Sequence, residues 1–167
     1  GGIDLPALLG DTYVRGVTLF TLKQAALSML LSALLGLAAA RAVHRRTGPR
    51  GARALHLLAS LALVMPTTVA AIGIVSVWGR AGWVADAADA LGLPGPGGAL
   101  YGLPGILLAH VFFNAPLMAR IFHAALAGIP DGRWRLAAQL GMGGREVWRF
   151  VEWPAIRRVA PGACGLV

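Results

Sequence analysis

Few residues in this sequence have the types and spacing that enzymatic chemistry requires. The only lysine, Lys23, has no glycine-rich run before it, so the chain has no loop that could hold the phosphates of ATP. The segment 141–143 begins a G-x-G pattern, but Glu146 stands where a dinucleotide-binding turn needs its third glycine. The histidines fit no H-E-x-x-H spacing, and Cys164 is a single cysteine. We therefore expect no catalytic residue, no metal site and no cofactor in this chain.

A hydrolase acting inside a membrane is a distant alternative. No serine stands in the G-x-S-x-G context of many hydrolase nucleophiles. The alternative depends on residues of apolar segments that could pair as nucleophile and base: Ser28, Ser32, Ser60, Ser76 and His110. Labelling with a serine-reactive probe would distinguish a hydrolase from a transporter.

The composition is that of a membrane protein. Hydrophobic residues make up 57% of the 167 residues and charged residues only 13%, which is too apolar for an ordinary soluble domain. A net charge of +8 does not indicate nucleic-acid binding, because the basic residues cluster at the ends of apolar runs. We expect the lipid bilayer to be the main partner, with no nucleic acid bound, and we interpret residues 1–167 as a fragment of one transmembrane domain.

Three apolar runs are long enough to cross a bilayer as helices, which takes about 20 residues. We expect these spans at about 20–41, 55–78 and 103–123, and a fourth span beginning at about 159. The first run carries a small residue at every fourth position, a stripe that favours close helix packing in lipid. Its members are Ser28, Ser32, Gly36 and Ala40.

Polar residues and a proline interrupt the second and third spans. Pro66 lies near the middle of the second, where the hydroxyl of Thr67 can satisfy a carbonyl freed by a kink. His110 and Asn114 lie one helical turn apart in the third and point the same way. Such residues can line a translocation path. A plain kink and an interhelical hydrogen bond are the alternatives.

Positive charge predicts the orientation in the membrane. Twelve of the fifteen Lys and Arg lie in the segments 41–53 and 120–158, and loops rich in Lys and Arg stay on the cytoplasmic side. The segment 86–103, rich in Gly and Pro, is expected to lie outside with a short surface helix. These patterns predict an all-α, multi-pass membrane protein with the segment 120–158 on the cytoplasmic side.

The segment 129–154 is both charged and patterned as a helix. We expect Asp131 to be the N-cap, and the glycines at 141, 143 and 144 to supply left-handed conformations that end a helix and reverse the chain. Small residues and one aromatic share a face of the first helix, and this face is expected to admit another protein's side chains. They are Trp134, Ala137, Ala138 and Gly141.

The segment 129–154 resembles the EAA loop of ABC-importer permeases, the cytoplasmic helix–turn–helix that docks on the ATPase. The positions that match are Ala137, Gly141, Val151 and Pro154, and those that depart are Arg135, Leu136 and Trp153. The resemblance implies an ATPase-coupling loop formed by Trp134, Arg135, Ala137, Ala138, Gly141, Val151 and Pro154.

Longer stretches are similar to the first half of thiamine-importer permeases. They are T-L-K-Q-A-A-L-S at 21–28, W-G-R-A-G-W at 78–83, Y-G-L-P-G-I-L-L-A-H-V-F-F-N-A-P at 101–116, and L-A-A-Q-L-G-M with R-F-V-E-W-P at 136–154. The resemblance implies a helical bundle with a second permease half in the same full-length chain, a periplasmic solute-binding protein and an ATPase dimer that binds the ATP. Its cargo would be thiamine or thiamine phosphates, and a permease for ferric iron or another small solute is the alternative.

Overall fold

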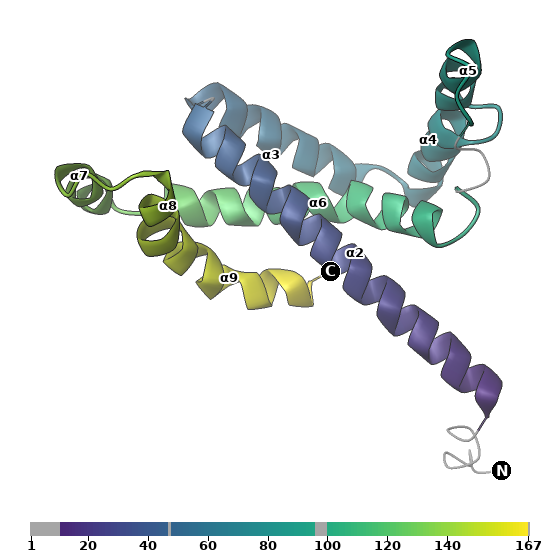
Figure 1. The fold of residues 1–167 in the computed structure, drawn as a ribbon, viewed down its shortest axis with the longest axis horizontal. Coiled ribbons are helices and arrows are strands. Elements are labelled where there is room, and N and C mark those ends of the chain that lie inside the picture. Colours follow the sequence, from purple (N-terminus) through teal and green to yellow (C-terminus); the bar gives the residue numbers. More distant parts are fainter. Residues whose placement is uncertain (1–10, 47, 96–99, 167) are drawn as a thin grey trace.

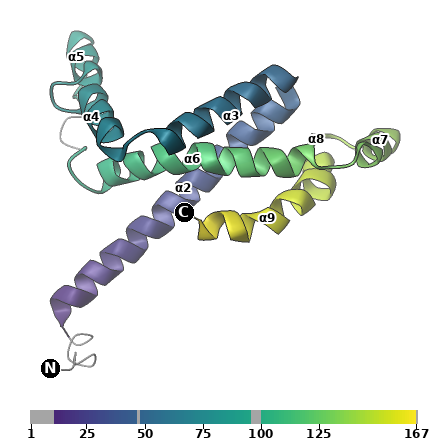
Figure 2. The same cartoon turned by 180° about the vertical axis from the view of Figure 1, so that it is seen from behind.

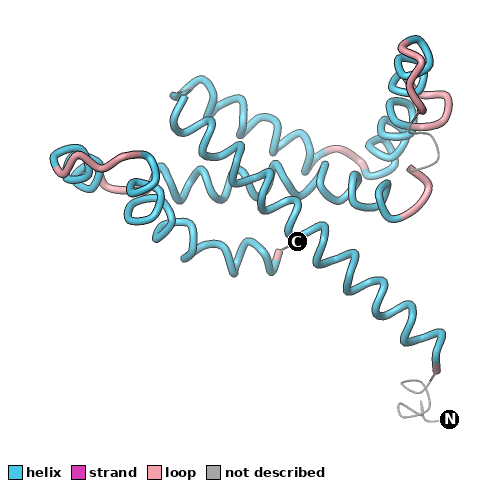
Figure 3. Tube along the Cα trace, in the orientation of Figure 1, coloured by secondary structure: helices cyan, strands magenta, loops and turns pink. Residues whose placement is uncertain are grey.

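Helices form nearly all of the protein that the computed structural model describes, which is residues 11–46, 48–95 and 100–166. This described part contains no strand (Figure 3), so the prediction of an all-α chain is confirmed. Along the chain the helices are α2 (Thr12–Arg46), α3 (Gly48–Val64), α4 (Thr67–Trp78), α5 (Trp83–Ala90), α6 (Leu103–Ala127), α7 (Asp131–Gln139), α8 (Gly144–Val147), the π-helix η2 (Trp148–Glu152) and α9 (Trp153–Gly165).

Helix α6 is the centre of the arrangement. Helix α2 crosses it and makes the most extensive packing contact in the chain, while α3 and α9 also pack along it (Figures 1 and 2). Helices α4 and α5 project from one end of α6, and α7 and α8 lie at the other. The loop 129–154 and the α4–α5 segment are therefore separated by the length of α6.

The predicted stripe of small residues forms the contact between α2 and α6. All four of its members are buried on α2. At Gly36 a Cβ atom would lie 2.5 Å from the Cβ of Met118 and 2.8 Å from the backbone nitrogen of Ala119. Only a residue without a side chain allows the two backbones to come this close. The interpretation of this stripe as a packing surface is confirmed.

Among the described residues, three segments are long and apolar enough to cross a membrane: Thr12–Arg46, Thr67–Ala90 and Leu103–Ala127. The expected spans at 20–41 and 103–123 lie inside the first and third. Helix α9, which starts at Trp153 rather than at 159, has 13 residues in the described part of the chain.

The second segment differs from the span expected at 55–78. Helix α3 ends at Val64, and α4 begins at Thr67 after Pro66, whose ψ is 134°. Proline has no N–H to donate and its ring disfavours a helical conformation in the residue before it, so the helix is interrupted rather than only kinked. After a turn at 79–82 the apolar stretch continues into α5, which shifts the candidate span to 67–90.

The two basic segments meet at one end of the molecule. The end of α2 and the start of α3 lie near α8 and η2, at the end of α6 opposite to α5 (Figure 1). Thr47, in the expected turn between them, lies outside the described residues, and the neighbouring Gly48 has a φ of 56°. This arrangement agrees with the expectation that 41–53 and 120–158 share one side of the membrane.

The buried core lies at this same end. Its largest fully buried apolar side chains are Met118 and Leu126 of α6 and Ile156 of α9. Residues of α2, α7 and η2, together with Ile129 between α6 and α7, also belong to the cluster. The loop 129–154 is thus packed into the core rather than suspended from the ends of two helices.

Candidate functional site

The first helix of the loop 129–154 begins differently from the prediction. Pro130, with φ −58° and ψ 139°, is the N-cap, and Asp131 is the first residue of α7. The prediction of Asp131 as the N-cap is therefore wrong. An acidic residue in the first turn still stabilises the helix, because it lies near the partial positive charge of the N-terminus.

The reversal after α7 is a Schellman turn. Gly141 has a φ of 65°, its N–H donates to the carbonyl of Ala138 at 3.1 Å, and the N–H of Met142 donates to the carbonyl of Ala137 at 3.0 Å. The predicted left-handed conformation is confirmed at Gly141. It is wrong for Gly143 and Gly144, neither of which has a positive φ.

The second limb of the loop is one continuous helical stretch from Gly144 to Gly165, through α8, η2 and α9. The N–H of Trp153 donates to the carbonyl of Trp148, five residues back. Pro154 follows, and it has no N–H and would clash with a carbonyl one α-turn earlier. The wider π turn accommodates this proline without breaking the helix.

The face predicted on α7 points partly into the protein itself. Ala137 is 4% exposed and Val151 is 5% exposed, and both belong to the core cluster. The ring of Trp134 packs against that of His44 with centroids 5.5 Å apart. Ala138 and Gly141 remain exposed. The side chain of Ala137 therefore packs mainly on the protein's own core, and its contact with another protein stays a prediction.

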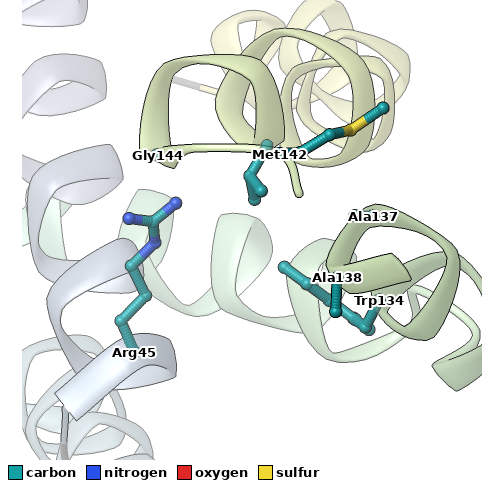
Figure 4. A pocket seen from close by; sticks show the side chains of 7 residues that line it. Arg45, Trp134, Ala137, Ala138, Met142 and Gly144 are labelled. Carbon is teal, nitrogen blue, oxygen red and sulfur yellow. The ribbon is translucent and has the colours of Figure 1, made fainter. Parts of the chain in front are cut away.

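Two grooves flank α7. One, of about 410 Å³, lies between α7, α8 and the end of α2. Figure 4 shows the Arg45 side chain on one wall, with Trp134 and Ala138 on the other. The residues lining it are Arg45, Trp134, Ala137, Ala138, Met142, Gly144 and Val147. The second groove, of about 260 Å³, lies on the other side of α7, between Arg133, Leu136 and Phe150.

Apolar side chains exposed on the loop were missed by the reasoning from sequence. Leu136 of α7, Leu140 at the C-cap of this helix and Phe150 of η2 are each more than half exposed. Arg135 is also exposed, whereas Pro154 is half-buried. The sequence did contain a signal for this exposure, because the leucines lie outside the face that carries the small residues. A helix exposes to solvent the side that does not pack on the core.

A buried carboxylate, also missed from the sequence, joins the loop to α2. Glu152 is completely buried, and its Oε2 accepts a hydrogen bond from Nε of Arg41 at 2.9 Å. Its Oε1 accepts from Nε of Arg45 at 2.8 Å, and Nη2 of Arg45 lies 2.7 Å from the same oxygen. The Arg41 guanidinium also lies over the Trp148 ring, 4.2 Å from its centroid. The position of an acid between the apolar Val151 and Trp153 was a signal that Glu152 is buried, but it did not identify the arginines that bind it.

Three histidines from different helices meet beside α7. The ring centroid of His123 in α6 lies 6.1 Å from that of His44 in α2 and 5.9 Å from that of His56 in α3. Within the described ranges no group of three His, Cys, Asp or Glu could hold a metal ion. These rings act as packing contacts between the helix ends.

His110 contacts α2. The amide Nε2 of Gln24 lies 3.1 Å from its Nδ1 and the hydroxyl of Ser28 lies 3.4 Å from the same atom, while this hydroxyl donates to the carbonyl of Ala25 at 3.0 Å. The geometry is that of an interhelical hydrogen bond. Asn114 is half-buried on the same helix. Within the described chain no hydrogen bond joins either residue to Pro66 or Thr67 at the break between α3 and α4.

The chain is similar in sequence to known transport permeases. No known family model matches the chain. It is 46% identical over 167 residues, all of its length, to the thiamine transport system permease protein ThiP of Brucella abortus (strain 2308). It is also 46% identical over 164 residues, 98% of its length, to ThiP of Escherichia coli (strain K12). The chain is homologous to a segment of thiamine transport system permeases.

The similarity covers only part of these permeases. The chain spans 30% of the length of either ThiP relative. A second kind of permease is more distantly similar, since the chain is 30% identical over 149 residues to the sulfate transport system permease protein CysW of Synechococcus elongatus. That match covers 89% of the chain and 50% of the relative. The chain is therefore similar to permeases that are named for two different solutes, thiamine and sulfate.

Proposed function

We propose that this chain is part of the permease subunit of an ATP-driven ABC importer in the bacterial inner membrane, with thiamine or a thiamine phosphate as the cargo. The observation that carries the proposal is the 46% identity to thiamine transport system permeases over the whole chain. Three candidate membrane spans support the location. The two basic segments at one end support a cytoplasmic position for the loop 129–154.

In this proposal the loop 129–154 is an EAA-type coupling loop on which an ATPase dimer docks. Its support is the pair of grooves on either side of α7 and the exposed Leu136, Leu140 and Phe150. Exposed apolar residues next to arginines are common at protein interfaces. The ATPase subunits would bind and hydrolyse the ATP, and this chain would hold no cofactor. A second permease half and a periplasmic solute-binding protein would complete the importer.

In this proposal the candidate translocation path is formed by four residues: Pro66 and Thr67 at the break between α3 and α4, and His110 and Asn114 of α6. Broken helices line transport paths in many transporters, and the break at Pro66 and Thr67 is of this kind. His110 and Asn114 lie on α6, where His110 is already hydrogen-bonded to α2. ATP-driven closure of the ATPase dimer would move the coupling loop and rock the helices between outward and inward access.

Uptake of labelled thiamine tests the proposal. Cells lacking the full-length subunit should import little thiamine, and restoring the subunit should restore uptake only when its ATPase is present. Labelled sulfate and ferric iron, supplied to the same cells, test the alternative cargoes. If restored cells import no more thiamine than deleted cells, thiamine is not the cargo, and restored sulfate or iron uptake would identify the alternative.

A further inference from the structure

The end of α2 contacts both limbs of the loop 129–154 through a single helical face. Arg41, His44 and Arg45 have spacings of three and four residues, which place them on one side of a helix. The ring of His44 packs on Trp134 of α7, and the two arginines bind Glu152 of η2. Neither limb can shift far without disturbing this last turn of α2.

Glu152 makes the strongest of these contacts. Its side chain is 0% exposed, whereas those of Arg41 and Arg45 are 33% and 40% exposed. A buried carboxylate without its partners is strongly unfavourable, because it has lost its hydration and has no ion pair or hydrogen bond to compensate. Separating Glu152 from both arginines is therefore opposed, and the three residues should move as a unit.

Movement of the C-terminal end of α2 can be transmitted along this helix to its contacts with α6. Helix α2 is continuous for 35 residues, from Thr12 to Arg46. Its contacts with α6 run from the close approach at Gly36 to Gln24, which bonds His110. A displacement of the last turn of α2 would consequently change the packing of α2 on α6 at membrane depth.

We propose that Glu152, held by Arg41 and Arg45, is a positioning residue that transmits movement of the loop 129–154 to α2. The inference rests on the proposed coupling function of this loop. It assigns the transmission to one buried carboxylate and two arginines rather than to the loop as a whole. Loss of the ion pairs should leave the ATPase docked but reduce the transport obtained from each ATP.

The test uses the full-length permease, reconstituted with its ATPase and binding protein in liposomes. The measured quantity is labelled thiamine imported per ATP hydrolysed. Glu152→Gln keeps the shape of the side chain and removes its charge, and it should lower this ratio at least about fivefold, the low end of typical coupling between sites. Arg41→Gln, at a partly exposed residue outside the 410 Å³ groove, provides a second variant if Glu152→Gln assembles poorly. Arg46→Gln is the matched control, because Arg46 is exposed and lies outside the ion pairs.

The double variant Arg41→Gln with Glu152→Gln distinguishes transmission from plain support. Residues that act as a unit give non-additive effects. The double variant should therefore import at least as much thiamine per ATP hydrolysed as Glu152→Gln alone. A merely structural role would lower the amount of assembled importer and leave the ratio of thiamine to ATP unchanged. That result would overturn the proposal.

Exchange of backbone amide hydrogens with solvent tests the transmission without any transported thiamine. When ATP and vanadate close the ATPase dimer, exchange in wild type should change both in 129–154 and in 38–46. In Glu152→Gln the change should persist in the loop and disappear from 38–46. Equal changes in both proteins would overturn the role of Glu152 and leave the proposed function intact. A wild-type loop that binds no ATPase would instead overturn the proposed function itself.

Discussion

At the scale of single residues, Gly141 owes its importance to its backbone. Its φ is 65°, and a Cβ atom built there would meet nothing within 4 Å. A side chain would therefore be opposed by the left-handed conformation and not by crowding. The turn after α7 depends on the torsion angle that only glycine adopts easily.

Gly141→Ala should destabilise the turn by about 1 kcal/mol, because alanine is unfavourable in the left-handed region. This corresponds to about a fivefold rise in the population of the opened loop, measured as the rate of limited proteolysis within 129–154. Gly132→Ala is the control, since Gly132 lies in α7 with open space around it and no positive φ. Equal cleavage of the two variants would contradict this account of the turn.

Neighbouring alanines on α7 should respond in opposite ways to the same change. Ala137→Leu adds volume to the core and should destabilise the loop by about 1–3 kcal/mol, seen as a lower permease level. Ala138→Leu extends an exposed wall of the 410 Å³ groove, so it should keep a normal level and lose bound ATPase. Copurification of the ATPase, normalised to permease level, is the measurement. Retention of full ATPase binding by Ala138→Leu would exclude this groove as part of the docking surface.

At the scale of elements, the contact between α2 and α6 depends on Gly36. Gly36→Ala should force the helices apart and destabilise the permease by about 1–3 kcal/mol, since the added Cβ would clash with Met118 and the backbone of Ala119. Thermal stability of the detergent-solubilised full-length protein measures this effect. Gly73→Ala in α4, where a Cβ meets nothing within 4 Å, should leave stability unchanged or raise it. If the two variants melt together, α2 and α6 do not depend on this close approach.

Patterns along the chain predicted which residues share a helical face but not which way the face points. The stripe that contains Gly36 was correctly interpreted as packing, because in a long apolar helix a row of small residues is itself the packing signal. On α7 the same periodicity grouped Ala137 with Ala138, and tertiary packing buried one and exposed the other. The pairing of Glu152 with arginines more than 100 residues away leaves no periodic trace in the sequence.

The second candidate span shows where hydropathy alone was insufficient. An uncharged run of adequate length predicted one kinked helix at 55–78, yet Pro66 separates α3 from α4. Hydropathy measures whether a segment can enter lipid, whereas the missing N–H of proline decides where a helix ends. The two criteria therefore predicted different boundaries for the same apolar stretch.

At the scale of the whole molecule, the two ends of α6 should face opposite sides of the membrane. Cysteines replacing Pro49 in α3 and Gly144 in α8 should be protected from a membrane-impermeant thiol reagent added to intact cells. A cysteine replacing Leu93, which is exposed after α5, should react. Permeabilised cells provide the control, because all three cysteines should then be labelled. Labelling at Pro49→Cys in intact cells would reverse the proposed orientation.

The π-helix at Trp148–Glu152 also determines which insertions and deletions the chain can tolerate over evolutionary time. A π turn holds one residue more than an α turn, so losing a single residue there would restore a regular helix. The helix beyond it would stay nearly in phase, because the residues of a π turn and of an α turn both cover about one revolution. A loss within the regular helix α9 would instead rotate everything beyond it by about 100°, the angle per residue of an α-helix, and would turn Ala163 out of the core. The segment Trp148–Glu152 should therefore tolerate the loss of one exposed residue better than α9 does.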